Sequence, residues 1–123
     1  MILAFLLGLL AVAATIAIIK IIVMGAKWLK NYILKRKEAN KNHRVVFADT
    51  RDVVDDYLKT KADEADEISM NELEELCEKT PFVAVDLDRN TDELENYEGI
   101  KAEQVDENFS ANLKKHDGIL IFD

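Results

Sequence analysis

Four oxygen-bearing side chains alternate along the short run Asp86-Leu-Asp-Arg-Asn-Thr-Asp92: they are Asp86, Asp88, Asn90 and Asp92. A hard cation such as Ca²⁺ binds oxygen ligands at this spacing, so one hypothesis is a divalent-cation-sensing module. The calcium loop also needs glycine at its sixth position and glutamate at its twelfth, where this chain has Thr91 and Tyr97. We therefore favour a simpler interpretation, in which Asp88 forms a turn and Asn90 caps a following helix.

Carboxylates also end three strand-like runs of the sequence, at Asp49, Asp86 and Asp123. If these strands are parallel, the three acids meet at the edge of the sheet where α/β proteins place their sites. Together with Asp88 they form a candidate catalytic set that would hold a metal ion and activate water. A metal-dependent hydrolase using Asp49, Asp86, Asp88 and Asp123 is thus the enzymatic alternative.

The order of these acids resembles that of PIN-domain nucleases. The resemblance spans about forty residues and rests on Asp49-Thr50 with Asp55 nearby, Asp66 at a helix start, and the run 82–88. It implies an enzyme that holds Mg²⁺ or Mn²⁺ on clustered carboxylates and hydrolyses RNA. The chain departs from the family pattern because a middle segment of that fold is missing.

The remaining sequence contains no comparable chemical motif. It has four glycines and neither a glycine-rich phosphate loop nor a nucleophile elbow, so we predict no cofactor. Its single cysteine, Cys77, excludes an internal disulfide and fits a reducing compartment. The primary prediction is accordingly a non-enzymatic protein.

Hydrophobic patterning outlines the elements that would position these residues. Strands are expected at 44–48, 82–85, 100–105 and 119–122. Helices are expected from Thr50, from the Ser69-Met-Asn-Glu72 capping box, around Leu94 and Tyr97, and after the cap Asp106. Strands that alternate with helices are typical of a small α/β domain with a mostly parallel sheet. We expect this domain at residues 44–123, after a polar linker at 38–43.

The N-terminal part of the chain has a different composition. Residues 1–26 contain one charge, Lys20, and residues 1–19 are about as long as a bilayer core is thick. The sequence therefore predicts a single-pass transmembrane helix with a basic juxtamembrane extension over residues 1–37. Residues 20–44 hold eight basic residues and one acidic residue, a net charge of +7, which places the N-terminus outside and the C-terminal domain in the cytoplasm. The side chains expected at the membrane interface are Lys20, Lys27, Trp28, Lys30, Tyr32, Lys35, Arg36 and Lys37.

A second pattern in this segment predicts self-association. One stripe of residues follows the alternating three- and four-residue steps of a left-handed helix pair, namely Ile19, Ile22, Ala26, Leu29 and Ile33. Ala4 and Gly8 add a pair of small residues that lets helices approach closely in lipid. A homo-oligomer built on this seam is therefore expected.

The C-terminal part of the chain reverses the sign of the charge. Residues 45–123 contain eight basic and 23 acidic residues, a net charge of −15. Such a domain is repelled by nucleic acid and attracts a protein partner with a basic surface. The sequence as a whole predicts a membrane-anchored assembly, scaffold or regulatory subunit, and a structural protein of a membrane-containing virus is a further alternative.

Overall fold

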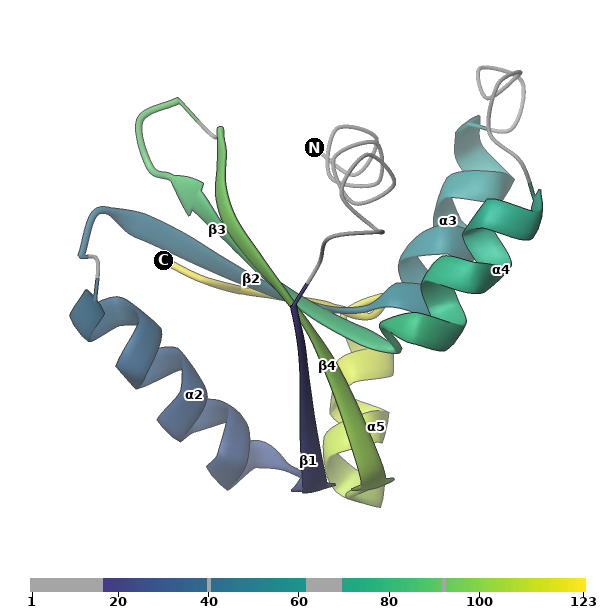
Figure 1. Cartoon of the computed structure of the whole chain (residues 1–123), viewed down its shortest axis with the longest axis horizontal. Coiled ribbons are helices and arrows are strands. Elements are labelled where there is room, and N and C mark those ends of the chain that lie inside the picture. Colours follow the sequence, from purple (N-terminus) through teal and green to yellow (C-terminus); the bar gives the residue numbers. More distant parts are fainter. Residues whose placement is uncertain (1–16, 40, 62–69, 92) are drawn as a thin grey trace.

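The computed structural model describes residues 17–39, 41–61, 70–91 and 93–123. They form an α/β domain whose five-stranded sheet has the strand order β1-β4-β3-β2-β5 (Figure 1). The elements in chain order are β1 (Ile18–Met24), α2 (Ala26–Ala39), β2 (His43–Asp49), α3 (Thr50–Lys61), α4 (Met70–Lys79), β3 (Phe82–Asp88), β4 (Leu94–Val105), α5 (Glu107–Lys115) and β5 (Ile119–Phe122).

The sheet is mixed and mostly antiparallel, so the prediction of a mostly parallel sheet is wrong. β2 pairs antiparallel with β3 and with β5, and β3 pairs antiparallel with β4. Among the described strands, only β1 and β4 run parallel. The segment around Leu94 and Tyr97, expected as a short helix, is instead part of β4. Because β4 follows β3 after a short turn, the two strands must be antiparallel: a parallel pair needs a long crossover.

The prediction of one continuous N-terminal transmembrane helix is also wrong. Ile18–Met24 forms the strand β1, and Gly25 separates this strand from α2. Five of the seven β1 residues are isoleucine or valine, whose branched side chains favour strands. Within the described ranges, no helix is long and apolar enough to cross a membrane. Residues 1–16, with the predicted seam positions Ala4 and Gly8, lie outside these ranges.

Two hydrophobic layers lie on opposite faces of the sheet. On one face, α3 and α4 pack against Val46 of β2 and Val85 of β3. On the other face, α2 and α5 pack against Phe47 of β2 and Ala84 of β3. Neighbouring residues of a strand thus face different layers, as the two-residue period of a strand requires. The sheet therefore separates α2 and α5 from α3 and α4.

Several elements agree with the sequence prediction. β2, β3 and β5 contain the expected strand runs, and α3 begins at Thr50 as expected. Asp106 caps α5, because its Oδ1 accepts a hydrogen bond from the Phe109 N–H at 2.9 Å. After α5 the chain turns through Asp117 and Gly118, both at positive φ, and enters β5 beside β2.

Candidate functional site

The structure separates one of the four candidate catalytic acids from the others. In the pairing of β2 with β3, Asp49 lies opposite Phe82, whereas Asp88 lies opposite His43 at the other end of β2. The two ends of β2 are six residue steps apart, which corresponds to about 20 Å along the strand. A shared edge was expected only for parallel strands, and here the ends of neighbouring antiparallel strands alternate between two edges.

Asp88 forms the turn that the sequence predicts. Its Oδ1 accepts hydrogen bonds from the backbone N–H groups of Asn90 at 2.8 Å and Thr91 at 3.0 Å. These two bonds, that from Asn90 first, lower the pKa of Asp88 below its ordinary value. A strand follows the turn, so Asn90 does not cap a helix. Asp92 lies outside the described residues, and across the described ranges no three His, Cys, Asp or Glu side chains are placed to hold a metal ion.

Asp123 lies among basic side chains just beyond β5. Its Oδ1 accepts a hydrogen bond from Arg44 Nε at 3.2 Å, and Arg89 Nε is 3.8 Å from the same oxygen. The bond from Arg44 lowers the pKa of Asp123. This carboxylate is 73 % exposed, so its ion pairs are surface pairs and contribute little to stability.

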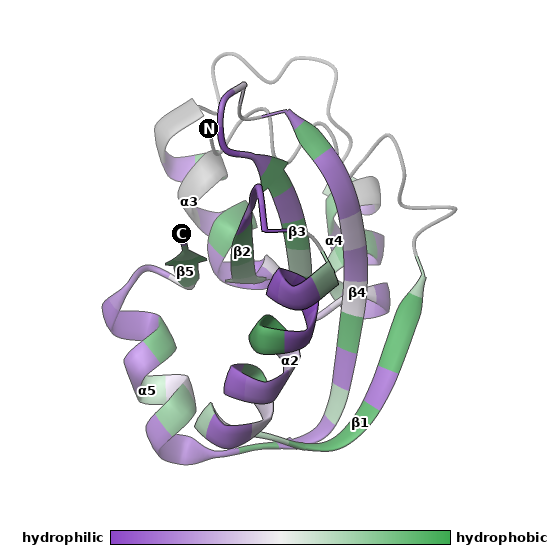
Figure 2. Ribbon diagram, turned by 90° about the vertical axis from the view of Figure 1, so that its left-hand side faces the viewer, coloured by the Kyte–Doolittle hydropathy of each residue, from purple (hydrophilic) through white to green (hydrophobic). Residues whose placement is uncertain are grey.

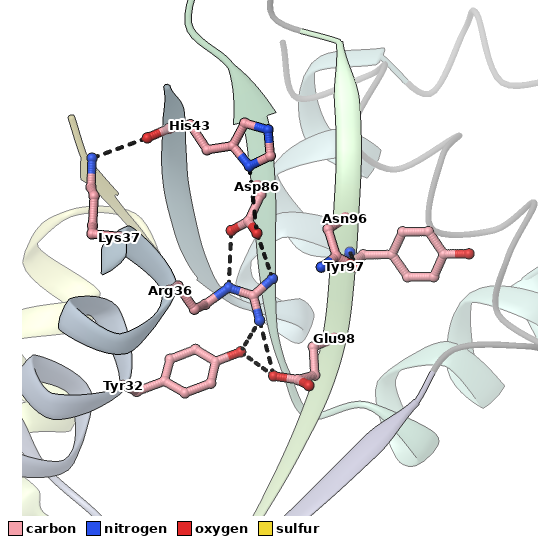
Figure 3. Close-up of polar contacts among 8 residues, drawn as sticks. All are labelled: Tyr32, Arg36, Lys37, His43, Asp86, Asn96, Tyr97 and Glu98. Carbon is pink, nitrogen blue, oxygen red and sulfur yellow. Dashed lines mark hydrogen bonds and ion pairs between the residues drawn. The ribbon is translucent and has the colours of Figure 1, made fainter. Parts of the chain in front are cut away.

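Asp86 belongs to a buried group of polar side chains, which we call the α2–sheet cluster. Its members are Tyr32 and Arg36 of α2, His43 of β2, Asp86 of β3 and Glu98 of β4 (Figure 3). Arg36 donates to both carboxylate oxygens of Asp86, from Nε and from Nη2, each at 2.9 Å. Arg36 Nη1 donates to Glu98 Oε1 at 3.0 Å and to the Tyr32 hydroxyl at 2.8 Å, and this hydroxyl donates to Glu98. One guanidinium thus joins α2 to two adjacent strands.

The α2–sheet cluster is largely shielded from solvent. The side chains of Arg36 and Asp86 are 12 % and 9 % exposed, and that of Glu98 is 25 % exposed. Burial raises the pKa of Tyr32, and the hydrogen bond to Glu98 raises it further. Burial lowers the pKa of Arg36, but the bond to Asp86 and the surrounding charges outweigh it, so the pKa is raised. A carboxylate bound at both oxygens by a permanently charged guanidinium is a poor base and a poor metal ligand, so this arrangement serves to fasten α2 to the sheet.

His43 and Lys37 extend the cluster toward the C-terminal end of α2. His43 Nδ1 is 3.8 Å from Asp86 Oδ2, and Lys37 Nζ donates to the backbone carbonyl of His43 at 3.1 Å (Figure 3). Burial and then the charge of Arg89 lower the pKa of Lys37. The last turns of α2 are therefore held to both β2 and β3.

The sequence contains only part of the signal for this cluster. Tyr32 and Arg36 are expected from the sequence at a membrane interface, whereas the structure places them between α2 and the sheet. Their four-residue spacing puts them on one helix face, near the apolar positions Leu29 and Ile33. Glu98 gives no such signal, because it lies in the segment that the pattern assigns to a helix.

The seam positions within the described residues have different environments. Leu29 and Ile33 are 5 % and 6 % exposed and pack in the domain's own core. Ile19 is partly exposed on β1, Ile22 on the same strand is 69 % exposed, and Ala26 is exposed at the start of α2. The apolar spacing at Leu29 and Ile33 is satisfied by packing of α2 on the sheet. Self-association through this stripe stays a prediction.

The outer face of α2 carries basic side chains. Lys27, Lys30 and Lys35 are exposed, and they flank Leu34, which is 52 % exposed. α2 as a whole has five basic residues and one acidic residue, a net charge of +4. Among the other predicted interface residues, Lys20 is exposed on β1, and Trp28 stacks on Tyr32 with ring centroids 5.0 Å apart. Lys27, Lys30 and Lys35 of α2 therefore point away from the sheet, while Arg36 points toward it.

Of the two helices on the opposite face of the sheet, α4 is acidic, whereas α3 has three basic and three acidic residues. α4 has four glutamates and one lysine, a net charge of −3, and the side chains of Glu75 and Glu78 are exposed. Glu74 bridges α4 to α3 through Arg51, with Nη1 and Oε1 2.8 Å apart. The sheet thus lies between a basic helix and an acidic helix.

An apolar groove of about 700 Å³ lies between α2 and α5. Leu29 and Ile33 form one wall, Phe109 lies in the opposite wall, and Leu120 and Phe122 of β5 form the floor. Figure 2 looks at the sheet from the side on which α2 and α5 lie. The rim is polar and includes Lys30, Asp106, Asn108, Asn112 and His116.

Comparison of the chain with protein-family models, with curated proteins and with solved structures finds no match. The geometry of the described residues thus supplies the functional argument. It consists of a buried ion-pair cluster beneath α2, two helix layers of opposite charge, and a groove beside α2.

Proposed function

We propose that this protein is a non-enzymatic assembly module that lies on an anionic membrane surface. In this proposal, the outer face of α2 contacts the lipid headgroups, and the acidic face of α4 is presented to a protein partner with a basic surface. The observation that carries the proposal is the position of the sheet between a helix of net charge +4 and a helix of net charge −3.

The α2–sheet cluster supports this proposal by fixing the orientation of α2. Arg36 and Tyr32 are bound beneath the helix, so Lys27, Lys30 and Lys35 share the outer face. Each lysine near an anionic leaflet contributes about 1 kcal/mol of attraction, and three contribute about a hundredfold in affinity. Exposed Leu34 adds an apolar contact at the centre of this face. Because the anionic leaflet of a cell membrane faces the cytoplasm, the proposal places the domain there.

The test is co-flotation of the full chain with vesicles of phosphatidylcholine that contain about one third phosphatidylserine, a lipid with the anionic charge that the proposal requires. The wild-type protein is expected to float with these vesicles at low salt and to bind neutral phosphatidylcholine vesicles about a hundredfold more weakly. The variant Lys27→Glu/Lys30→Glu/Lys35→Glu is expected to lose binding to the anionic vesicles.

The matched control is Lys59→Glu/Lys79→Glu/Lys101→Glu, which changes the net charge equally at exposed positions outside α2. This control is expected to retain most of the binding. Equal loss of binding in both variants would mean that only the net charge of the protein matters. Equal binding of the wild type to neutral and anionic vesicles would mean that the lysines of α2 do not contact the lipid. Either result overturns the proposed orientation.

The acidic face is tested separately, with an oligolysine peptide as the probe. Glu75→Gln/Glu78→Gln is expected to weaken peptide binding, since it removes two exposed charges from α4. Glu103→Gln/Glu107→Gln changes the charge equally on β4 and α5 and is expected to have the smaller effect. An effect of the same size in both variants would argue against α4 as the partner surface.

A further inference from the structure

The groove between α2 and α5 is a second candidate binding site, which shares Lys30 and Leu34 with the outer face of α2. Its volume of about 700 Å³ falls in the range of small-molecule sites in proteins. Leu120 and Phe122 form its floor and remain partly exposed, although both belong to the apolar layer beneath α2 and α5. A groove of this size with an accessible apolar floor favours an apolar ligand.

Some polar side chains of the rim already make hydrogen bonds within the protein. Asp106 Oδ1 accepts the hydrogen bond that caps α5, and His116 Nδ1 lies 2.9 Å from the carbonyl oxygen of Asn112. Lys30 makes no ion pair with any residue in the described part of the chain. The rim therefore carries one carboxylate, Asp106, which is engaged in capping α5, and one lysine, Lys30, that can pair with an anionic group.

The apolar lining also discriminates between an alkyl chain and a peptide. An extended peptide laid on Leu120 and Phe122 would bury backbone N–H and C=O groups against side chains that cannot pair with them, which costs free energy for each group. An alkyl chain carries no such groups, and each methylene that it buries is favourable. The lining thus favours a hydrocarbon chain over an extended polypeptide.

We infer that this groove binds the single alkyl chain of an anionic amphiphile, with its headgroup at Lys30. The ligand class comprises fatty acids and single-chain phospholipids, which share a hydrocarbon chain and a negative headgroup. The inference does not depend on vesicle binding by the outer face of α2, because a monomeric amphiphile enters the groove in solution.

The test is calorimetric titration of the full chain with dodecanoate below its micelle concentration. Asn112→Trp places a large side chain at the rim of the groove, and Ala111→Trp places the same side chain at the neighbouring exposed position of α5. We expect the Asn112 variant to bind dodecanoate at least tenfold more weakly and the Ala111 variant to bind it as the wild type does. Equal affinity in the two variants overturns the inference.

The position of the ligand is tested by methyl NMR. Leu29 and Leu120 line the groove, whereas Leu73 and Leu76 lie in the layer on the opposite face. Dodecanoate is expected to shift the first pair and leave the second pair unchanged. The Leu73 and Leu76 signals of each variant without ligand, compared with those of the wild type, verify that it is folded. Shifts of similar size in both pairs would mean non-specific binding and contradict the inference.

The headgroup is tested with Lys30→Gln. This variant is expected to weaken dodecanoate binding about threefold, as for an exposed charge pair, and not to weaken binding of dodecyltrimethylammonium, whose cationic headgroup is repelled by Lys30. If Asn112→Trp instead dissociates a dimer while dodecanoate affinity stays constant, the groove is a contact between two copies and the inference fails.

Discussion

Arg36 and Asp86 form a bidentate ion pair that joins α2 to β3, with both N···O distances at 2.9 Å. The pair spans fifty residues of sequence and is almost completely buried. Glu98 and Tyr32 complete the partners of the guanidinium, and this contact acts together with the packing of Leu29 and Ile33 to orient α2 on the sheet. The basic outer face of α2 and one wall of the apolar groove depend on it in turn.

Replacing Asp86 by asparagine is expected to destabilise the domain by about 3 kcal/mol. The variant leaves the Arg36 charge buried with a weaker partner, and breaking one side of a buried ion pair costs more than the pair contributes. Urea unfolding followed by circular dichroism gives the measurement.

Asp88→Asn supplies the control for this prediction. Asp88 is partly exposed in the turn, and asparagine also accepts hydrogen bonds from backbone N–H groups there. A change below about 0.5 kcal/mol is expected. Equal stability of the Asp86 and Asp88 variants would contradict a structural role for the α2–sheet cluster.

Local sequence signals predicted the elements whose pattern and caps agree. β3 is a run of buried apolar residues, and α5 begins after Asp106, whose side chain caps it. β5 follows an Asp117-Gly118 turn that the sequence marks clearly. In these segments, propensity, capping and hydrophobicity all indicate the same structure.

Tertiary contacts determine the elements that differ from the sequence prediction. Ile18–Met24 is apolar enough for a membrane helix, yet it pairs with β4 as a strand on the edge of the sheet. β4 agrees with the sequence prediction over 100–105, whereas its part around Leu94 and Tyr97 is predicted as a helix and becomes a strand through its register with β3. The Arg36 and Asp86 partnership is equally non-local, because no sequence spacing relates a residue of α2 to one of β3. The prediction of a catalytic cluster of strand-end acids assumes parallel strands. The strands that carry these acids are antiparallel, so the acids do not all meet at one edge.

Asp49→Asn tests a pH dependence of stability. Burial raises the pKa of Asp49 above its ordinary value of 3.8, despite the opposing hydrogen bond from the Asp52 N–H at 3.2 Å. A carboxyl whose folded-state pKa is raised contributes stability at low pH, and that contribution is lost as the pH rises through the folded-state pKa. Asparagine keeps the acceptor oxygen and carries no charge.

The variant is therefore expected to gain stability over the wild type as the pH is raised, and to differ least below pH 3.8. Urea unfolding of both proteins at a series of pH values measures the difference directly. A difference that is constant with pH, or that shrinks as the pH rises, would contradict a buried charge at Asp49.

The turn between α5 and β5 provides a pair of substitutions with opposite expected signs. Gly118 has φ of +79°, and an added Cβ would meet the side chain of Asp52. Gly118→Ala is therefore expected to cost about 2 kcal/mol or more. Asp117 has φ of +55°, so Asp117→Gly is expected to add about 0.5 kcal/mol by removing left-handed strain. Thermal unfolding of the two variants tests the signs, and destabilisation by both would contradict the turn geometry.

The last prediction concerns Gly99, where β3, β4 and β1 meet. Gly99 pairs with Val83 of β3 and with Ile18 of β1, and a Cβ at this position would lie 2.6 Å from Thr80 Cγ2. Gly99→Ala is expected to cost about 1–3 kcal/mol, because neither the strand nor the buried threonine has room to move. Thr80→Ser removes the methyl group and keeps the hydroxyl, which donates to the Leu76 carbonyl at 2.9 Å.

If the methyl group causes the clash, the double variant is more stable than the sum of the two single changes predicts. A double-mutant cycle in urea should give a favourable coupling of about 1 kcal/mol, because residues in direct contact are not additive. Additive effects would mean that Gly99 is required by the backbone of β4 and not by its contact with Thr80.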